Sequence, residues 1–269
     1  MAAQMKVLVA AALTVSALLS VADARPGRAL LQGSRTITVH NNCSETIWLA
    51  AHTTPGHNLL TEPASPVLPP GGSAAYYTDN NWIGRIWGRT KCGGDPFRCG
   101  TADCDGVTCR FGVTGTPPAT LAEFAMTQWG GLDFYDVSVV DGFNLPMQIA
   151  PSVSSCVTAG CEYDIVATNN CPAPLQQKDS NGAVIGCYNA CAAPEFQSSP
   201  DLDKYCCIGK YIDADACIAV HPDAYTTAHK QACPLAYSYA YDDANKSLFA
   251  CAQANYDIYF CGGPGLTKF

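Results

Sequence analysis

The sequence predicts a mainly β fold, an antiparallel sandwich or barrel that is stapled by disulfides. Short segments rich in β-branched and aromatic residues recur along the chain, with clusters of Gly, Pro, Asn and Asp between them. The first half of the chain shows no long pattern with the helical period. The 16 cysteines among 269 residues are an even number, which is typical of the disulfide framework of a secreted protein.

Four strands are expected before the first cysteine-rich segment. Residues 36–41 (TITVHN) alternate between polar and apolar side chains, and residues 46–51 (TIWLAA) form the next candidate. Residues 52–73 are rich in Pro, Gly and Thr and predict a long loop, because Pro and Gly interrupt regular structure. Strands resume at residues 74–78 and 83–89, with an Asp-Asn-Asn turn signal between them.

Two cysteine-rich segments interrupt this pattern. Four cysteines within residues 92–109 predict a loop segment that leaves the sheet, has local disulfides and contains little regular structure. Residues 161–233 contain eight cysteines and the one helix candidate, residues 222–232, in which Pro222 suits the first helical turn. The last strand is expected at residues 256–260 (YDIYF).

Composition and charge exclude several classes of function. The net charge is −8, whereas nucleic acids and anionic membranes attract basic surfaces, so neither is expected as a partner. The chain has no Walker A, Rossmann or G-x-S-x-G motif, and no cofactor is expected. Zinc is the rival explanation for the cysteines, but a CxxC pair is missing and the five histidines are scattered, so no metal is expected.

The N-terminus has the features of a secretory signal. Lys6 gives a positive start, residues 7–21 form an apolar run, and the tripeptide ADA at residues 22–24 fits a cleavage site. We therefore expect a signal peptide over residues 1–24, a leader over residues 25–34 and export from the cell. A signal anchor is the alternative, which the short apolar run disfavours.

Residues 120–147 combine carboxylates with apolar and aromatic side chains. The acids of this stretch are Glu123, Asp133, Asp136 and Asp141. If Gly130-Gly131 marks a hairpin turn, Glu123 falls nearly opposite Asp136, and like charges placed so destabilise a sheet. Such a pair is kept for a function or beside a cation, and Arg85 from an earlier strand is the candidate cation. Asp133 is expected to be a turn or surface acid.

Two Asn-X-Ser sequences fit the acceptor for N-glycosylation, at Asn245 and at Asn42. We expect modification of Asn245. Asn42 precedes Cys43, a half-cystine that should hinder the modification. The alternative is that both are unmodified surface asparagines.

Several motifs together resemble the thaumatin-like proteins, the plant group also called pathogenesis-related family 5. The resemblance covers residues 36–261 and includes the cysteine-rich run CGTADCDGVTC at residues 99–109. Sixteen cysteines fit the larger members, although Asp95 stands where the family pattern has glycine. The other matching motifs are GRIWGRT at 84–90, TLAEF at 120–124, DFYD at 133–136, GFNLPM at 142–147, YCC at 205–207 and AYSYAYDD at 236–243.

This resemblance implies a fold of three parts. The parts are an antiparallel β-sandwich core of residues 34–89, 124–161 and 234–261, a small disulfide-stapled domain of residues 90–123, and a disulfide-rich, partly helical domain of residues 162–233, followed by a tail of residues 262–269. The implied disulfides are Cys43–Cys261, Cys92–Cys99, Cys104–Cys109, Cys156–Cys251, Cys161–Cys233, Cys171–Cys187, Cys191–Cys206 and Cys207–Cys217.

The resemblance further implies an acidic cleft between the core and the helical domain. Its matching positions are Arg85, Glu123, Asp136, Asp141 and Asp242. Glycosidases use two carboxylates, and Glu123 and Asp136 are the catalytic candidates, whereas the other three would orient sugar hydroxyls. The alternative is that the acids bind a sugar without cleaving it. The nearby aromatic side chains either stack on sugar rings or belong to the core: Trp129, Phe134, Tyr135, Tyr239 and Tyr241.

The expected function is that of a secreted defence protein, antifungal or directed at cell walls, whose cleft binds β-1,3-glucan. A weak endo-β-1,3-glucanase activity would follow from the two carboxylates. The alternative is a non-catalytic interaction or stress protein, such as an inhibitor of foreign hydrolases. A monomer outside the cell is expected, with vacuolar sorting as the alternative location.

Overall fold

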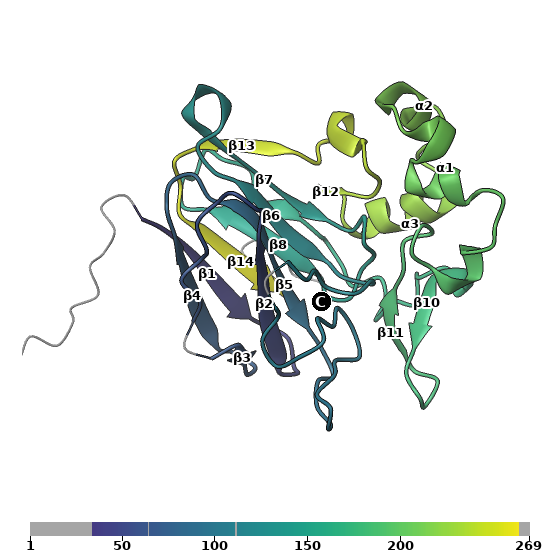
Figure 1. Cartoon of the computed structure of the whole chain (residues 1–269), viewed down its shortest axis with the longest axis horizontal. Helices are drawn as coiled ribbons and strands as arrows, with labels where there is room; N and C mark the ends of the chain where they lie inside the picture. Colours follow the sequence, from purple (N-terminus) through teal and green to yellow (C-terminus); the bar gives the residue numbers. More distant parts are fainter. Residues whose placement is uncertain (1–33, 64, 111, 264–269) are drawn as a thin grey trace, which may run out of the picture. The chain divides into compact units, whose positions relative to one another are not determined.

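The structure, a computed structural model, describes residues 34–63, 65–110 and 112–263. The predicted signal peptide, most of the leader and most of the tail lie outside these residues. Two β-sheets form the described core, which confirms the mainly β fold (Figure 1). The first sheet contains, in spatial order, β4 (Ser73–Thr78), β1 (Arg35–Asn41), β14 (Tyr256–Phe260), β8 (Met147–Pro151) and β9 (Ala159–Gly160).

The second sheet has seven strands and carries the candidate site. Its order is β12 (Ala236–Tyr237), β7 (Leu132–Ser138), β6 (Leu121–Ala125), β5 (Ile83–Arg89), β2 (Ile47–Thr53) and β3 (Val67–Leu68), and β13 (Phe249–Ala252) pairs with β7. The strands predicted at residues 83–89 and 256–260 have the predicted bounds, and the others differ by one or two residues at their ends.

Two strand pairs depart from the antiparallel expectation. β1 runs parallel to β14, and β12 runs parallel to β7. The first pair joins opposite ends of the chain, so no hairpin imposes an antiparallel direction on it. Its two strands end side by side, with Asn41 opposite Phe260, and the Cys43–Cys261 disulfide follows directly.

The core lies between the two sheets. Along β1 the side chains alternate between buried and half-buried, so that Ile37 and Val39 face the second sheet's apolar side chains. The second sheet contributes Phe124 and Tyr135, whose rings pack against Tyr256 of β14. The opposite, outer face of the second sheet carries charged side chains of β5, β6 and β7 together with apolar ones such as Ile83 and Phe134.

Asp133 belongs to this core, which corrects its expected place in a turn or at the surface. It is fully buried, and its carboxylate forms an ion pair of 2.9 Å with Arg35. The same carboxylate accepts hydrogen bonds from the Tyr256 hydroxyl and from the backbone amides of Thr127 and Ala254. Because Asp133 and Asp136 are three residues apart in one strand, they lie on opposite faces of the sheet.

Residues 162–233 contain short helices and a hairpin, which lie together at one side of the sheets (Figure 1). These elements are β10 (Gln176–Lys178), β11 (Val184–Cys187), α1 (Leu202–Cys206), α2 (Ala214–Ile218) and α3 (Ala224–Ala232). The predicted helix is α3, and it begins after Asp223, whose side chain caps it. In the described part of the chain no helix is long and apolar enough to span a membrane.

Eight disulfides staple the fold. They join Cys43–Cys261, Cys92–Cys99, Cys104–Cys109, Cys156–Cys251, Cys161–Cys233, Cys171–Cys187, Cys191–Cys206 and Cys207–Cys217. These are the pairs that the family resemblance implies. Cys161–Cys233 connects the end of β9 to the end of α3 and so ties the helical region to the first sheet.

Candidate functional site

The second sheet places four ionisable side chains in one row across its strands. His52 of β2 lies opposite Arg85 of β5, which lies opposite Glu123 of β6. Glu123 in turn lies opposite Asp136 of β7, as predicted, because the turn η1 (Trp129–Gly131) joins the two strands. Directly opposed residues of antiparallel strands share one face of the sheet, so the four side chains are neighbours on the outer face.

Two adjoining hollows follow this row. Both are lined by Arg85, Glu123 and Asp136, and their volumes are about 170 and 350 Å³. The smaller hollow continues along apolar side chains that include Ile83, Phe134 and Leu248. The larger hollow continues along polar side chains that include Ser138, Asp141, Tyr237 and Asp243. We call the two hollows together the cleft.

The residues that line the two hollows belong to the second sheet and to the segments beside it. They come from β5, β6 and β7 and their connections, from Thr54 and from residues 237–248. Residues 162–233 supply none of the described side chains that line the two hollows. The helical region contacts residues 236–247 of this lining segment through Lys230 of α3.

Arg85 is the cation of the cleft. Its Nε lies 3.7 Å from Glu123 Oε1, and its Nη1 lies 3.9 Å from Asp141 Oδ2. All three side chains are between 30% and 39% exposed, so each ion pair stabilises the fold only weakly. These side chains are half-buried, and their exposed parts are accessible to a ligand.

Burial and mutual repulsion raise the pKa values of the cleft acids. The pKa of Asp136 is raised well above its ordinary value by burial, then by the charges of Glu123 and Asp243, and Arg85 opposes the shift. Burial also raises the pKa of Glu123, although Arg85 counteracts it. Asp136 Oδ1 is buried without a hydrogen-bond partner among the described residues. Asp136 is therefore the acid of the pair that keeps its proton to higher pH.

Asp136→Asn is expected to stabilise the protein at pH 7 by about 1 kcal/mol, the scale of a like-charge cross-strand pair. The raised pKa of Asp136 means that its ionisation costs stability as the pH rises through that pKa. The stability gain from Asp136→Asn should therefore vanish at a pH below the ordinary aspartate pKa of 3.8. Asp136 is then protonated in both the folded and the unfolded protein. Urea unfolding of the wild type and the variant at pH 7 and at a pH below 3.8 measures this difference in the free energy of unfolding. Glu195→Gln, an exposed acid outside the cleft, is the control, and an equal gain there would contradict the explanation.

Asp242 does not line the cleft, which corrects the expectation from the resemblance. It is only 1% exposed and forms an ion pair of 3.0 Å with Lys230. Its Oδ2 also accepts hydrogen bonds from the backbone amide and the hydroxyl of Ser238. The short helix η5 (Asp242–Asn245) begins here and turns the next side chain outward.

Asp243 is the acid that this segment supplies to the cleft. It lines the larger hollow and its charge contributes to the raised pKa of Asp136. The Tyr237 hydroxyl, also in the lining, donates a hydrogen bond to the Asp243 carboxylate. The sequence pattern shows two adjacent acids at 242 and 243 and does not distinguish the buried one from the exposed one.

Residues 41–262 match the model of the thaumatin family. This chain belongs to the thaumatin family. Pathogenesis-related thaumatin-like protein 3.5 of Cryptomeria japonica is 43% identical over 85% of this chain and 90% of its own length. Pathogenesis-related protein 5 of Arabidopsis thaliana is 43% identical over 83% of this chain and 89% of its own length. The membership expected from the motifs is confirmed.

Two further comparisons involve proteins named for glucan hydrolysis. A glucan endo-1,3-beta-glucosidase of Prunus avium is 40% identical to this thaumatin-family chain over 84% of the chain and 90% of its own length. The β-1,3-glucanase domain of Clostridium beijerinckii, of the GH64 type, superposes with a TM-score of 0.51 over 85% of this chain and 98% of that domain. At 12% identity, the second likeness concerns the fold alone.

The aromatic side chains near the acids have different places in this thaumatin-family structure. Phe134 lines the smaller hollow of the cleft. Tyr135 and Tyr239 are buried, whereas the Tyr241 hydroxyl donates to the backbone carbonyl of Ile212. Trp129 is 86% exposed at the hairpin tip and does not line either hollow. Phe134 is the one candidate of the five that is placed to stack on a ligand in the cleft.

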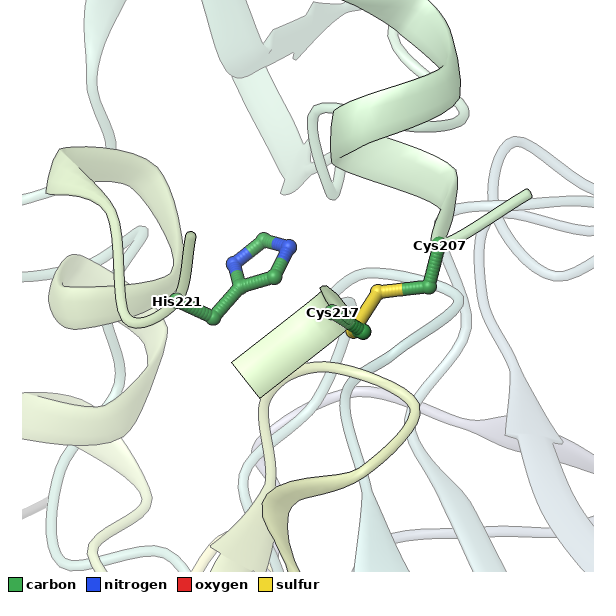
Figure 2. Close-up of side chains that lie close together, drawn as sticks. All are labelled: Cys207, Cys217 and His221. Atoms are coloured by element: carbon green, nitrogen blue, oxygen red, sulfur yellow. A yellow bond between two sulfur atoms is a disulfide. The ribbon is translucent and has the colours of Figure 1, made fainter. Parts of the chain in front are cut away.

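Cys207, Cys217 and His221 lie close together in the helical region (Figure 2). Figure 2 shows the two sulfurs joined to each other beside the imidazole. A disulfide offers no thiolate, and thiolate is the form of cysteine that binds metal. In the disulfide-bonded protein this group therefore has a structural role, and His221 stacks on Tyr239 with ring centroids 4.7 Å apart.

The sequon asparagine Asn245 is exposed at the end of η5. Its amide donates to Asp242 Oδ1 at 2.6 Å and to the Tyr239 hydroxyl at 3.2 Å. The sequon hydroxyl of Ser247 is fully buried. Glycosylation of Asn245 stays a prediction.

Proposed function

We propose that this thaumatin-family chain is a secreted defence protein whose cleft binds β-1,3-glucan. The observation that carries the proposal is the row of Arg85, Glu123 and Asp136 along a solvent-open hollow that continues to Phe134. Carboxylates and a guanidinium pair well with sugar hydroxyls, and an aromatic face packs on the apolar face of a glucose ring. The name of the Prunus avium relative supports β-1,3-glucan as the polysaccharide.

Slow endo-hydrolysis of the bound glucan is the second part of the proposal. Two carboxylates in different protonation states can act as general acid and as base or nucleophile. Asp136 suits the acid, because burial and the neighbouring charges raise its pKa most clearly. Glu123 suits the ionised partner, because Arg85 lies beside it and favours its charged form. Asp141 and Asp243 would orient hydroxyl groups at the larger hollow.

Co-sedimentation with insoluble β-1,3-glucan tests the binding. The wild type should pellet with β-1,3-glucan and stay in solution with cellulose. Arg85→Met should bind at least about tenfold more weakly, since a charge-assisted hydrogen bond contributes roughly 1.5–3 kcal/mol. Arg98→Met, which loses an exposed ion pair with Asp105 outside the cleft, should bind like the wild type. A wild type that never pellets with β-1,3-glucan would refute the proposed function.

A further inference from the structure

We propose that Lys230 of α3 is a positioning residue for the cleft, and that it acts through the buried Asp242 to hold Asp243 and Tyr237 in place. The proposal rests on the proposed function only for its binding readout. It explains how the helical region, which lines neither hollow, can fix the position of two side chains in the cleft. It also gives Asp242 a function other than ligand contact.

Asp242 is held on every side by hydrogen bonds from within the fold. Its Oδ2 accepts from Lys230 Nζ at 3.0 Å, from the Ser238 amide at 3.0 Å and from the Ser238 hydroxyl at 2.9 Å. Its Oδ1 accepts from the Asn245 amide at 2.6 Å. A carboxylate that is 1% exposed and bound in this way is fixed in position and has little access to a ligand.

Lys230 binds both ends of the segment that carries the cleft residues. Besides Asp242, its Nζ donates to the Ala236 carbonyl at 2.8 Å and to the Ser247 hydroxyl at 2.7 Å. All three ammonium donors are thereby used. Ser247 closes the loop, because its hydroxyl is also within hydrogen-bond distance of the Ala236 carbonyl and donates to the Asp242 carbonyl. One lysine from α3 thus gathers residues 236, 242 and 247 around a single charged group.

The two cleft side chains lie within the segment that Lys230 gathers. Tyr237 follows Ala236 directly, and Asp243 follows Asp242 directly. Both line the larger hollow, where the Tyr237 hydroxyl donates to the Asp243 carboxylate. Because Asp242 is fixed inside, the first turn of η5 presents Asp243 to the cleft. The position of Asp243 in the larger hollow therefore depends on a contact outside the cleft.

The test compares Lys230→Met with Arg35→Met, since each removes the cation of a buried ion pair. The Arg35–Asp133 pair lies between the two sheets and away from the cleft. Arg35→Met should therefore destabilise the protein as Lys230→Met does, without removing a contact of residues 236–247. The readouts are the melting temperature, binding to insoluble β-1,3-glucan, and the NMR ring resonance of Tyr237 in tyrosine-labelled protein. Tyr237→Phe assigns that resonance.

Both variants should melt at lower temperature. Lys230→Met should also shift the Tyr237 resonance and weaken glucan binding at least about fivefold, because Asp242 must reach water and takes Asp243 with it. Arg35→Met should leave the resonance and the binding as in the wild type, when measured well below its melting temperature. If the Tyr237 resonance of Lys230→Met does not shift, the proposal is overturned. Lys230 would then only stabilise the fold.

The double variant Lys230→Met/Asp242→Asn carries the test if Lys230→Met does not fold. It removes the unpaired buried charge and should recover most of the lost melting temperature. The Tyr237 resonance should stay shifted, because methionine cannot donate to the Ala236 carbonyl or to Ser247. A wild-type resonance in the double variant would overturn the proposal. If the wild type does not bind β-1,3-glucan, the proposed function fails, and the Tyr237 resonance still decides the role of Lys230.

Discussion

Glu123→Gln is expected to lower the release of reducing ends from β-1,3-glucan by about 100-fold or more. The substitution keeps the size of the side chain and removes the carboxylate that faces Asp136 across β6 and β7. Glutamine can neither attack the sugar nor take a proton from water, whereas it can still hydrogen-bond to sugar hydroxyls. Binding to insoluble glucan should therefore stay within about threefold of the wild type, or roughly 0.6 kcal/mol.

A reducing-end assay on soluble β-1,3-glucan at several pH values measures this effect. Glu195→Gln is the matched control, since it removes an equal charge from an exposed position outside the cleft. The wild-type activity should fall at low pH as Glu123 is protonated and at high pH as Asp136 loses its proton. Activity that survives in Glu123→Gln would show that Glu123 is not a catalytic residue.

Arg35→Met should reduce the free energy of unfolding by about 3–5 kcal/mol, the cost of leaving one member of a buried ion pair without its partner. Asp133 would keep its hydrogen bonds from Tyr256 and two backbone amides but lose its only described ion pair. Arg35 also donates to the Ala254 carbonyl, so the substitution removes a hydrogen bond to the residues that precede β14. Urea unfolding of the oxidised protein at pH 7 measures the loss.

Lys91→Met provides the comparison for Arg35→Met. Lys91 pairs with Glu45 at 3.5 Å, and these side chains are 41% and 62% exposed. An exposed ion pair contributes only about 0–1 kcal/mol, so Lys91→Met should change the free energy of unfolding by less than about 1 kcal/mol. Equal losses in the two variants would mean that the burial of the Arg35–Asp133 pair is not the source of its effect.

The strands could be predicted from the sequence where the pattern is local. Residues 83–89 and 256–260 are short runs that carry β-branched and aromatic side chains, so their strands appear with the predicted bounds. The helices α1 and α2 have five residues each, which is too short for a helical period to show in the sequence. The parallel pairing of β1 with β14 depends on segments more than 200 residues apart and has no local signal.

The acids of the candidate site also divide into those placed by a local pattern and those placed by contacts between distant segments. Glu123 and Asp136 lie opposite each other because a single hairpin joins them, and its glycines were visible in the sequence. The strand period also places Asp133, three residues before Asp136, on the opposite, buried face of β7. The choice between Asp242 and Asp243 depends on Lys230 from α3 and on the turn of η5. No periodicity in the sequence reports such a contact.

The most direct measurement of the central claim is an NMR titration of the labelled protein with a soluble β-1,3-linked glucose hexamer. Binding in the cleft predicts that the largest shifts fall on Arg85, Glu123, Asp136, Phe134 and Asp243, with Asp242 changing less than Asp243. A β-1,4-linked glucose hexamer should leave these resonances unchanged. Shifts confined to residues outside the cleft, or equal shifts with both sugars, would contradict the account.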